Sequence, residues 1–75
     1  MPFSLAAAQR VQVFVVDLTG RRVRTLIDRA LADGDHAAVW DGLADGGRRA
    51  RPGVYYVVLG AGDAGRKGQK VVLLP

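Results

Sequence analysis

Gly60, Gly62 and Gly65 follow an apolar run with the spacing G-x-G-x-x-G. In dinucleotide-binding folds this spacing opens a helix whose amide N–H groups hold a pyrophosphate. Only ten residues follow Gly65, and residues 70–74 have the composition of a strand. No room remains for a βαβ unit with its acidic residue about 20 positions further on. The pattern therefore predicts a glycine-rich hairpin turn, and we expect no cofactor.

Four aspartates, Asp33, Asp35, Asp41 and Asp45, raise the question of a Ca²⁺ site. The stretch of residues 41–52 lacks the 1-3-5 oxygen spacing and the terminal bidentate Glu of an EF-hand. Aspartates that precede glycine commonly accept hydrogen bonds from nearby backbone amides and form turns. We therefore predict turns in this region and no metal site.

Ser4 and His36 are the single serine and the single histidine, so the residue types of a Ser-His-Asp triad are present. Ser4 lacks a nucleophile-elbow sequence, and His36 shares strand parity with Ala38 and Trp40, which places it at the rim of a core. The absence of cysteine excludes a thiolate zinc site and a cysteine nucleophile. We expect no catalytic residues and no enzymatic activity.

Lysine and arginine number 11 against seven acidic residues, which gives a net charge of +4. The cations form three clusters: Arg21, Arg22 and Arg24; Arg48, Arg49 and Arg51; Arg66, Lys67 and Lys70. With Tyr55 or Tyr56 stacking on bases, such clusters would suit a nucleic-acid backbone. The aspartates interspersed with them break a single-sign stripe, and charges on edge strands also discourage aggregation. Nucleic-acid binding is therefore an alternative function and not the favoured one.

The elements that carry these residues are short. Seventy-five residues suffice for one domain, and the longest apolar run has six residues, 54–59, too few to span a membrane as a helix. Turn-forming pairs divide the chain into six predicted strands: three strong ones at residues 11–16, 54–59 and 70–74, and three weaker ones at residues 3–5, 22–27 and 36–40. Residues 23–32 also have apolar positions at helical spacing, so a helix there is an alternative.

Both faces of the two strongest strands are apolar. In the first strand, one face carries Val11, Val13 and Val15 and the other carries Gln12, Phe14 and Val16; in the second strand, Tyr55, Val57 and Leu59 oppose Val54, Tyr56 and Val58. This pattern indicates either a core shared on both sides or an additional apolar patch that is available to a partner.

The order of the turns and strands has a specific resemblance. The chain contains D-x-x-G-R-x-V at residues 17–23, G-x-H-x-x-x-W-D-G at residues 34–42, D-x-G-R at residues 45–48 and P-G-V-Y at residues 52–55. As a set, these motifs resemble the FlgD-type Ig-like domain, which is related to the flagellar hook-capping protein. They are also similar to the C-terminal sorting domain of the type IX secretion system. The resemblance covers residues 3–74.

The resemblance implies a small Ig-like (fibronectin III-like) antiparallel β-sandwich of about six to seven strands, formed by residues 1–75 as a single domain. It implies a non-catalytic module near the C-terminus of a longer bacterial protein that is secreted or displayed at the cell surface. Such a module would serve in export, surface attachment or domain assembly. Its partners would be a neighbouring domain of the parent protein or the secretion or assembly machinery. A flagellar hook-capping scaffold is the alternative.

Within that fold, seven residues are expected to be structural: Asp17, Gly20, Trp40, Asp41, Gly42, Gly53 and Tyr55. Trp40 should anchor the core at the end of a strand and needs an acceptor for its indole N–H. A second set forms the expected interaction surface: Phe14, Val16, Val54, Tyr56 and Val58. Through this surface, or through open strand edges near residues 3–5 and 70–74, we expect the domain to form a homo-oligomer or to dock on a neighbour.

Overall fold

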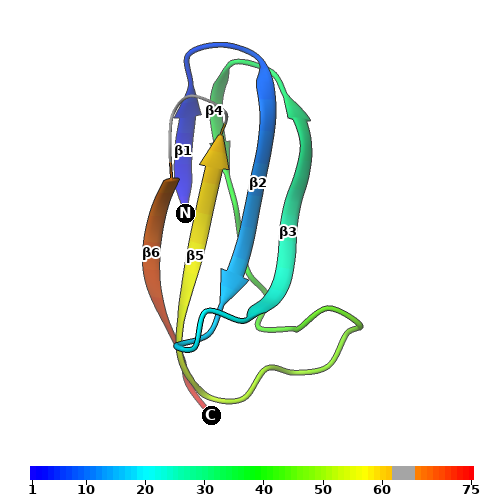
Figure 1. Cartoon of the computed structure of the whole chain (residues 1–75), viewed down its shortest axis with the longest axis vertical. Helices are drawn as coiled ribbons and strands as arrows, with labels where there is room; N and C mark the ends of the chain where they lie inside the picture. Colours follow the sequence, from blue (N-terminus) through cyan, green and yellow to red (C-terminus); the bar gives the residue numbers. More distant parts are fainter. Residues whose placement is uncertain (62–65) are drawn as a thin grey trace.

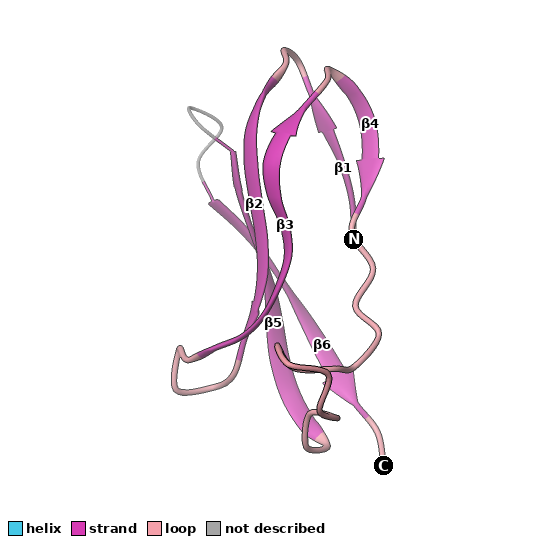
Figure 2. Cartoon of the chain, turned by 90° about the vertical axis from the view of Figure 1, so that its right-hand side faces the viewer, coloured by secondary structure: helices cyan, strands magenta, loops and turns pink. Residues whose placement is uncertain are grey.

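The computed structural model describes residues 1–61 and 66–75, which form two antiparallel β-sheets packed face to face (Figure 1). The larger sheet has the strand order β3-β2-β5-β6, and the smaller sheet pairs β1 with β4. Figure 2 shows the two sheets from the side, with β1 and β4 to the right of the upper part of the larger sheet. The strand bounds are β1 Pro2–Leu5, β2 Gln9–Val16, β3 Arg22–Leu31, β4 Gly34–Ala37, β5 Gly53–Ala61 and β6 Arg66–Leu73.

The all-β sandwich expected from the sequence is confirmed. Its six strands correspond to the six predicted ones, and the described residues contain no helix. That part of the chain accordingly has no helix long and apolar enough to cross a membrane.

The third strand differs from the sequence expectation. β3 runs from Arg22 to Leu31 and pairs with β2 along its length, so the alternative of a helix over residues 23–32 was wrong. The pairing skips Leu26 and Val23, because the register shifts between Val13 and Phe14 and again between Val15 and Val16. Each shift is a β-bulge, which adds one residue to one strand. Because the two bulges are three residues apart, they interrupt the alternation of side chains that a regular strand has. The apolar residues of β3 therefore recur with the spacing of a helix.

The fourth strand is also shorter than expected at its end. It stops at Ala37, so Trp40 does not end a strand but lies in the loop that follows it. The ladder with β1 closes where the backbone N–H of Ala38 donates to the oxygen of Met1 at 2.9 Å and the Met1 ammonium donates to the Ala38 oxygen at 2.7 Å. The pairing of β4 with the N-terminal segment therefore ends at Ala38, before Val39 and Trp40.

The glycine-rich stretch lies between two paired strands. β5 ends at Ala61, β6 begins at Arg66, and Gly60 lies opposite Arg66 in an antiparallel ladder. The flanking strands therefore have the arrangement of a hairpin rather than of a strand that leads into a nucleotide-binding helix. The turn predicted at residues 62–65 itself lies outside the described residues.

The core forms on the inner face of β2 and β5. Val11, Val13 and Val15 are each 0% exposed. They lie beside the buried side chains of Tyr55, Val57, Leu59 and Ala61 on the same side of the larger sheet, and the smaller sheet covers them with Leu5 and half-buried Phe3. Removing such side chains from water is the main favourable contribution to folding. The strand parity read from the sequence thus groups correctly the residues that share each face, and the structure shows which face is the inner one.

The turn from β2 to β3 is organised by Asp17. Its Oδ1 accepts hydrogen bonds from the Thr19 hydroxyl at 2.6 Å, the Thr19 N–H at 2.9 Å and the Arg21 N–H at 3.1 Å. Gly20 adopts a φ of 85°, which an L side chain disfavours, and its N–H donates to the Asp17 backbone oxygen at 3.0 Å. The hydrogen bond from the Thr19 side chain is the main cause of a lowered pKa at Asp17.

Below the smaller sheet, Trp40 and the loop that follows it extend the cover of the core. The Trp40 ring meets the Tyr55 ring edge-on at a centroid distance of 5.0 Å, and its Nε1–H donates to the Leu43 oxygen at 2.9 Å. The Tyr55 hydroxyl donates to the Arg51 oxygen at 2.6 Å, four residues upstream. Tyr55 is buried, whereas Trp40 is half-buried. The indole thus finds its expected acceptor, and it contacts the core from the rim.

The remaining structural residues lie around this loop. Asp41 Oδ1 accepts the Leu43 N–H at 3.0 Å, which forms the expected aspartate turn. Gly42 has a φ of 81°, and a Cβ added there would lie 3.3 Å from a methyl carbon of Leu73. A side chain at this position would therefore be strained by the positive φ and would require the Leu73 methyl group to shift by a few tenths of an ångström. Gly53 begins β5 opposite Leu73.

Truncating Trp40 should destabilise the domain. We expect Trp40→Ala to lower the free energy of unfolding by about 2–4 kcal/mol, less than for a fully buried indole, because the ring is only half-buried. The nearby Val39 is 81% exposed, so Val39→Ala should change stability by less than about 0.5 kcal/mol. Urea unfolding followed by circular dichroism measures both. Equal midpoints for the two variants would show that the indole does not support the core.

Acid should weaken the β2–β3 turn through Asp17. Because the pKa of Asp17 is lowered by folding, its contribution is complete above its ordinary value of 3.8 and is lost as the pH falls through the lowered value. Asp17→Asn should therefore flatten the pH dependence of stability below about pH 4. Asp33→Asn is the control, since that exposed carboxylate has no hydrogen-bond or ion-pair partner among the described residues. Unfolding midpoints at pH 3 and pH 6 test this, and parallel losses in wild type and D17N would contradict it.

Candidate interaction surface

The outer side of the larger sheet carries a continuous set of apolar side chains. Phe14 lies opposite Val58 and Val16 opposite Tyr56 in the β2–β5 ladder, while Val54 lies opposite Val72 in the β5–β6 ladder. Paired residues project to the same side of a sheet. The register therefore joins the five residues singled out from the sequence, and adds Val72. We call this set, Phe14, Val16, Val54, Tyr56, Val58 and Val72, the outer apolar face.

The described residues leave this face only partly covered. Tyr56 is 38% exposed and Val72 is 55% exposed, while Val16, Val54 and Val58 are half-buried. The smaller sheet packs on the opposite side of the larger one. In an antiparallel sandwich the outward positions are usually polar. Apolar side chains at these central positions are thus a departure from the usual pattern, and such departures mark contact surfaces.

Phe14 is the most buried member of the outer apolar face, at 8% exposed. The Arg22 guanidinium lies 4.0 Å from the centre of its ring, in a cation–π arrangement. Arg22 pairs with Val16 across the β2–β3 ladder, which places its side chain on the same side of the sheet. The cover over Phe14 is therefore an exposed, charged side chain and not a packed apolar one.

The rim of the outer apolar face is basic. Lys70 lies opposite Tyr56, and Arg66 lies opposite Gly60 on the same side of the sheet. Asp28 also projects to this side, where it forms an ion pair with Arg10 at 2.6 Å. The surface thus combines apolar side chains with the cations of Lys70, Arg66 and Arg22, which form no ion pair among the described residues, a combination suited to an apolar partner that carries carboxylates.

The hydroxyl and imidazole groups examined for catalysis do not come together as a triad. Ser4 donates to Asp35 Oδ1 at 2.6 Å, and the Nε2 atom of His36 is 2.7 Å from the Ala32 oxygen. Ser4 and His36 pair with neighbouring positions of the β1–β4 ladder, Asp35 and Phe3, so they project to opposite sides. His36 stacks on Phe3 at 5.5 Å, as expected for a residue at the rim of the core.

Two of the four aspartates considered as Ca²⁺ ligands, Asp41 and Asp45, instead accept backbone hydrogen bonds and lie near a cation. Asp41 accepts the Leu43 N–H, and Asp45 Oδ1 accepts the Thr25 N–H at 3.2 Å. Both carboxylates lie 3.9 Å from the Arg24 guanidinium. Among residues 1–61 and 66–75, no three carboxylate or imidazole groups form a cluster that could hold a metal ion.

The cationic clusters considered for nucleic acid are dispersed and partly engaged. Arg24 is held by the loop after β4, with the Leu43 and Ala44 oxygens 3.5 and 3.4 Å from its guanidinium. Arg22 lies over Phe14. Residues 48–51 belong to the loop before β5, at the opposite end of the sandwich from Arg66, the first residue of β6 (Figure 1). The clusters therefore do not merge into one stripe.

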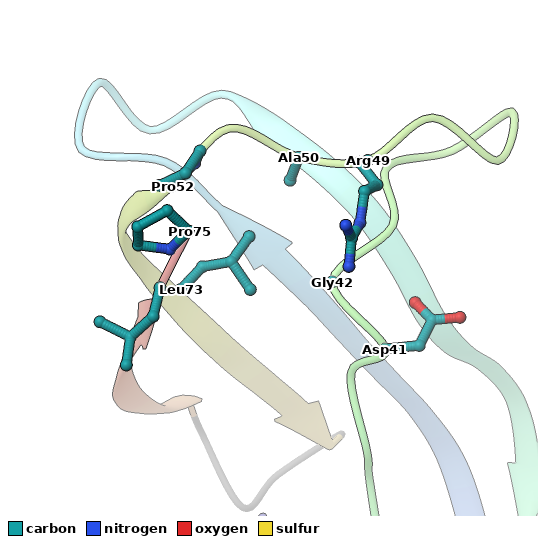
Figure 3. Close-up of a pocket in the computed structure, with 8 residues that line it drawn as sticks. Asp41, Gly42, Arg49, Ala50, Pro52, Leu73 and Pro75 are labelled. Atoms are coloured by element: carbon teal, nitrogen blue, oxygen red, sulfur yellow. The ribbon is translucent and has the colours of Figure 1, made fainter.

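A pocket of about 400 Å³ opens where the loop after β4 meets the chain end. Figure 3 shows Asp41 and Arg49 on the loop side of this pocket and Leu73 and Pro75 on the other side. Ala50, Pro52 and Leu74 complete an otherwise apolar lining. The charged side chains come from one wall only, so the pocket offers an apolar recess and no constellation of acid, base and nucleophile.

The sequence pattern alone missed Val72 and Arg22 as parts of the surface. Val71 and Val72 are equivalent as letters, and only the β5–β6 register places Val72 outside and Val71 inside. The place of Arg22 depends on the bulges in β3, which change the parity of the strand. A signal was nevertheless present for Val72, since strand alternation puts it on the side of Lys70.

The comparison with protein families agrees with this geometry. Residues 3–65 match the family model described as the FlgD Ig-like domain. No curated protein and no solved structure matches the chain significantly. The family match spans most of the 75 residues. It begins within β1, includes β2 to β5 and ends at the residue before β6. The chain therefore belongs to the family of FlgD Ig-like domains.

Proposed function

We propose that the chain is a non-catalytic assembly domain that docks on a neighbouring protein surface through the outer apolar face. The observation that carries this proposal is the exposure of Tyr56 and Val72 at central and neighbouring positions of a sheet whose other side is already buried. The FlgD Ig-like family is a structural one, which supports a non-catalytic role. In this proposal the surface gives affinity by removing apolar area from water, and the basic rim selects the partner.

Two settings suit such a domain. In the first, it is an accessory module of a larger bacterial protein that is secreted or held at the cell surface, where it serves in export, attachment or domain assembly. In the second, it is part of a scaffold related to flagellar hook capping, which the family match favours at least as strongly. The domains encoded beside it distinguish the two: a large catalytic or adhesive region supports the first, and a short hook-capping protein supports the second.

Docking predicts that outer-face substitutions matter only where a neighbour is present. Tyr56→Ser together with Val58→Thr should lower the melting temperature of the domain by about 4–8 °C more within its parent protein than in the isolated chain, which corresponds to a docking contribution of about 1 kcal/mol. Differential scanning calorimetry measures this on four samples: the wild-type and the doubly substituted domain, each as the isolated chain and within the parent protein. Val39→Thr is the matched control, because Val39 is exposed and lies outside the outer apolar face.

Three other results would contradict docking on a neighbouring protein surface. An equal loss in both samples would mean that Tyr56 and Val58 support only the fold. If the isolated chain sediments as a dimer at micromolar concentration, and the double substitution returns it to a monomer, the occupant of the face is a second copy. Salt-dependent binding to an oligonucleotide by the unmodified chain would favour the nucleic-acid alternative.

A further inference from the structure

The strand edges of this sandwich differ in how open they are. In the smaller sheet, Met1 and Ala38 exchange both backbone hydrogen bonds, so the next residue of β1, Pro2, directs its backbone away from β4. Proline has no N–H to offer at that edge. Only Ser4 remains as a donor toward the free side of the four-residue strand β1. This edge is poorly suited to pairing with a further strand.

The edge of β3 is also partly occupied. The Asp45 N–H donates to the Val23 oxygen at 2.9 Å, and the Asp45 carboxylate accepts the Thr25 N–H at 3.2 Å. Asp45 is thus hydrogen-bonded to Val23 and Thr25, two alternate positions of the β3 edge at which an added strand would otherwise pair. The two bulges of β3 add twist along the same edge, which further hinders pairing.

The edge of β6 has neither a proline, as β1 has, nor, among the described residues, a loop residue hydrogen-bonded to it, as β3 has. β6 has eight residues, Arg66–Leu73, and none is proline. It pairs with β5 on one side, and among the described residues no strand pairs on its other side (Figure 1). Alternate residues of an antiparallel strand direct their N–H and C=O groups to each side, so half of β6 presents both groups to the free edge. Such an edge is a template for strand addition.

The side chains of β6 specify what would fit beside it. Its first part carries the cations Arg66, Lys67 and Lys70 and no acidic residue. Its last part is apolar: Val72 is 55% exposed on the outer side, and Val71 and Leu73 on the inner side are half-buried. By contrast, the inner-facing residues of the adjacent β5 are buried. The smaller sheet therefore leaves the β6 flank of the core incompletely covered.

We propose that the free edge of β6 binds an extended polypeptide segment of another protein as an added antiparallel strand. The segment carries acidic residues beside Arg66, Lys67 and Lys70 and apolar residues beside Val71, Val72 and Leu73. Backbone hydrogen bonds fix the segment to the edge, while the charges and the apolar side chains select its sequence. The site is the free edge of β6: it shares Val72, Lys70 and Arg66 with the outer apolar face and its rim, but it does not use Tyr56 or Val58.

A second copy of this chain does not have the required chemistry. Antiparallel pairing of β6 with β6 of another molecule would place Arg66 and Lys67 of each strand beside apolar residues of the other, bring the two Lys70 residues close together and supply no carboxylate. Like charges on neighbouring strands are destabilising. The occupant is therefore a segment of opposite charge, and the basic side chains that prevent self-pairing are the same ones that recognise it.

A synthetic peptide tests the proposal with the 75-residue chain itself. The acetylated, amidated probe Val-Val-Val-Asp-Thr-Thr-Asp-Asp places its apolar half beside the end of β6 and its acids beside the beginning. Binding should slow hydrogen exchange of alternate β6 amides, as measured by nuclear magnetic resonance. A version N-methylated at alternate residues on the pairing edge keeps the side chains but loses donors, and should bind at least about tenfold more weakly.

Charge variants provide the second arm. Lys67→Glu with Lys70→Glu should weaken binding of the acidic probe and favour a probe with Lys in place of Asp. The matched control, Arg29→Glu with Arg48→Glu, makes the same charge change away from β6 and should bind the acidic probe within about twofold of wild type in salt that screens distant charges. Circular dichroism verifies that each variant is folded.

Three results would overturn the proposal. One is equal binding of the N-methylated probe, which would mean that charge alone attracts the peptide. Another is protection that appears on β3 or β1 rather than β6. The last is no binding of the acidic probe at millimolar concentration. The Tyr56→Ser and Val58→Thr variant should still bind the probe, so failure at the edge and failure of outer-face docking are distinguishable.

Discussion

The pairing of β2 with β5 is the constraint on which the rest of the structure depends. Their ladder joins Val11 through Val16 to residues 56–61, and the inner side chains of both strands form the core. Because the two strands are central, each needs a neighbour on its other edge and a cover on its inner face. β3 and β6 supply the neighbours, while two strands of four residues and the loop that contains Trp40 supply the cover. The short cover explains why Trp40 packs at the rim and why Val71 and Leu73 stay half-buried.

The strands could be predicted from the sequence because the β-branched runs of β2 and β5 are dense and are bounded by turn residues. Parity alone separated the side chains of these strands into two faces. Which side is covered could not be deduced, since Val11 and Phe14 are both apolar and only the position of β1 and β4 distinguishes them. The bulges at Val23 and Leu26 were hidden for a related reason: an extra residue in a strand produces the same apolar spacing as a helical turn.

Two arginine side chains, Arg22 and Arg24, help to cover or hold other parts of this domain. The Arg24 guanidinium draws the loop residues Asp41 and Asp45 toward β3, and Asp45 in turn occupies that strand's edge. On the outer side, Arg22 covers Phe14 but nothing comparable covers Tyr56 or Val72 among the described residues. The aspartates thus serve mainly within the fold, which leaves the cations of β6 facing outward. Part of the net positive charge of the sequence is therefore presented to solvent along β6.

The ladder between β1 and β4 has a consequence for the order of folding. Its closing hydrogen bond joins residues 37 positions apart, and the β2–β5 ladder joins pairs as distant in sequence as Val11 and Ala61, whereas β2 and β3 are neighbours in the chain, as are β5 and β6. Contacts between distant residues carry a larger loop-closure entropy and form late. The β2–β3 and β5–β6 hairpins are therefore expected to form before the β2–β5 and β1–β4 ladders that join distant parts of the chain. The inner valines would stay open to water while only the hairpins exist, so the slow step of folding is the joining of the hairpins and not the formation of the strands.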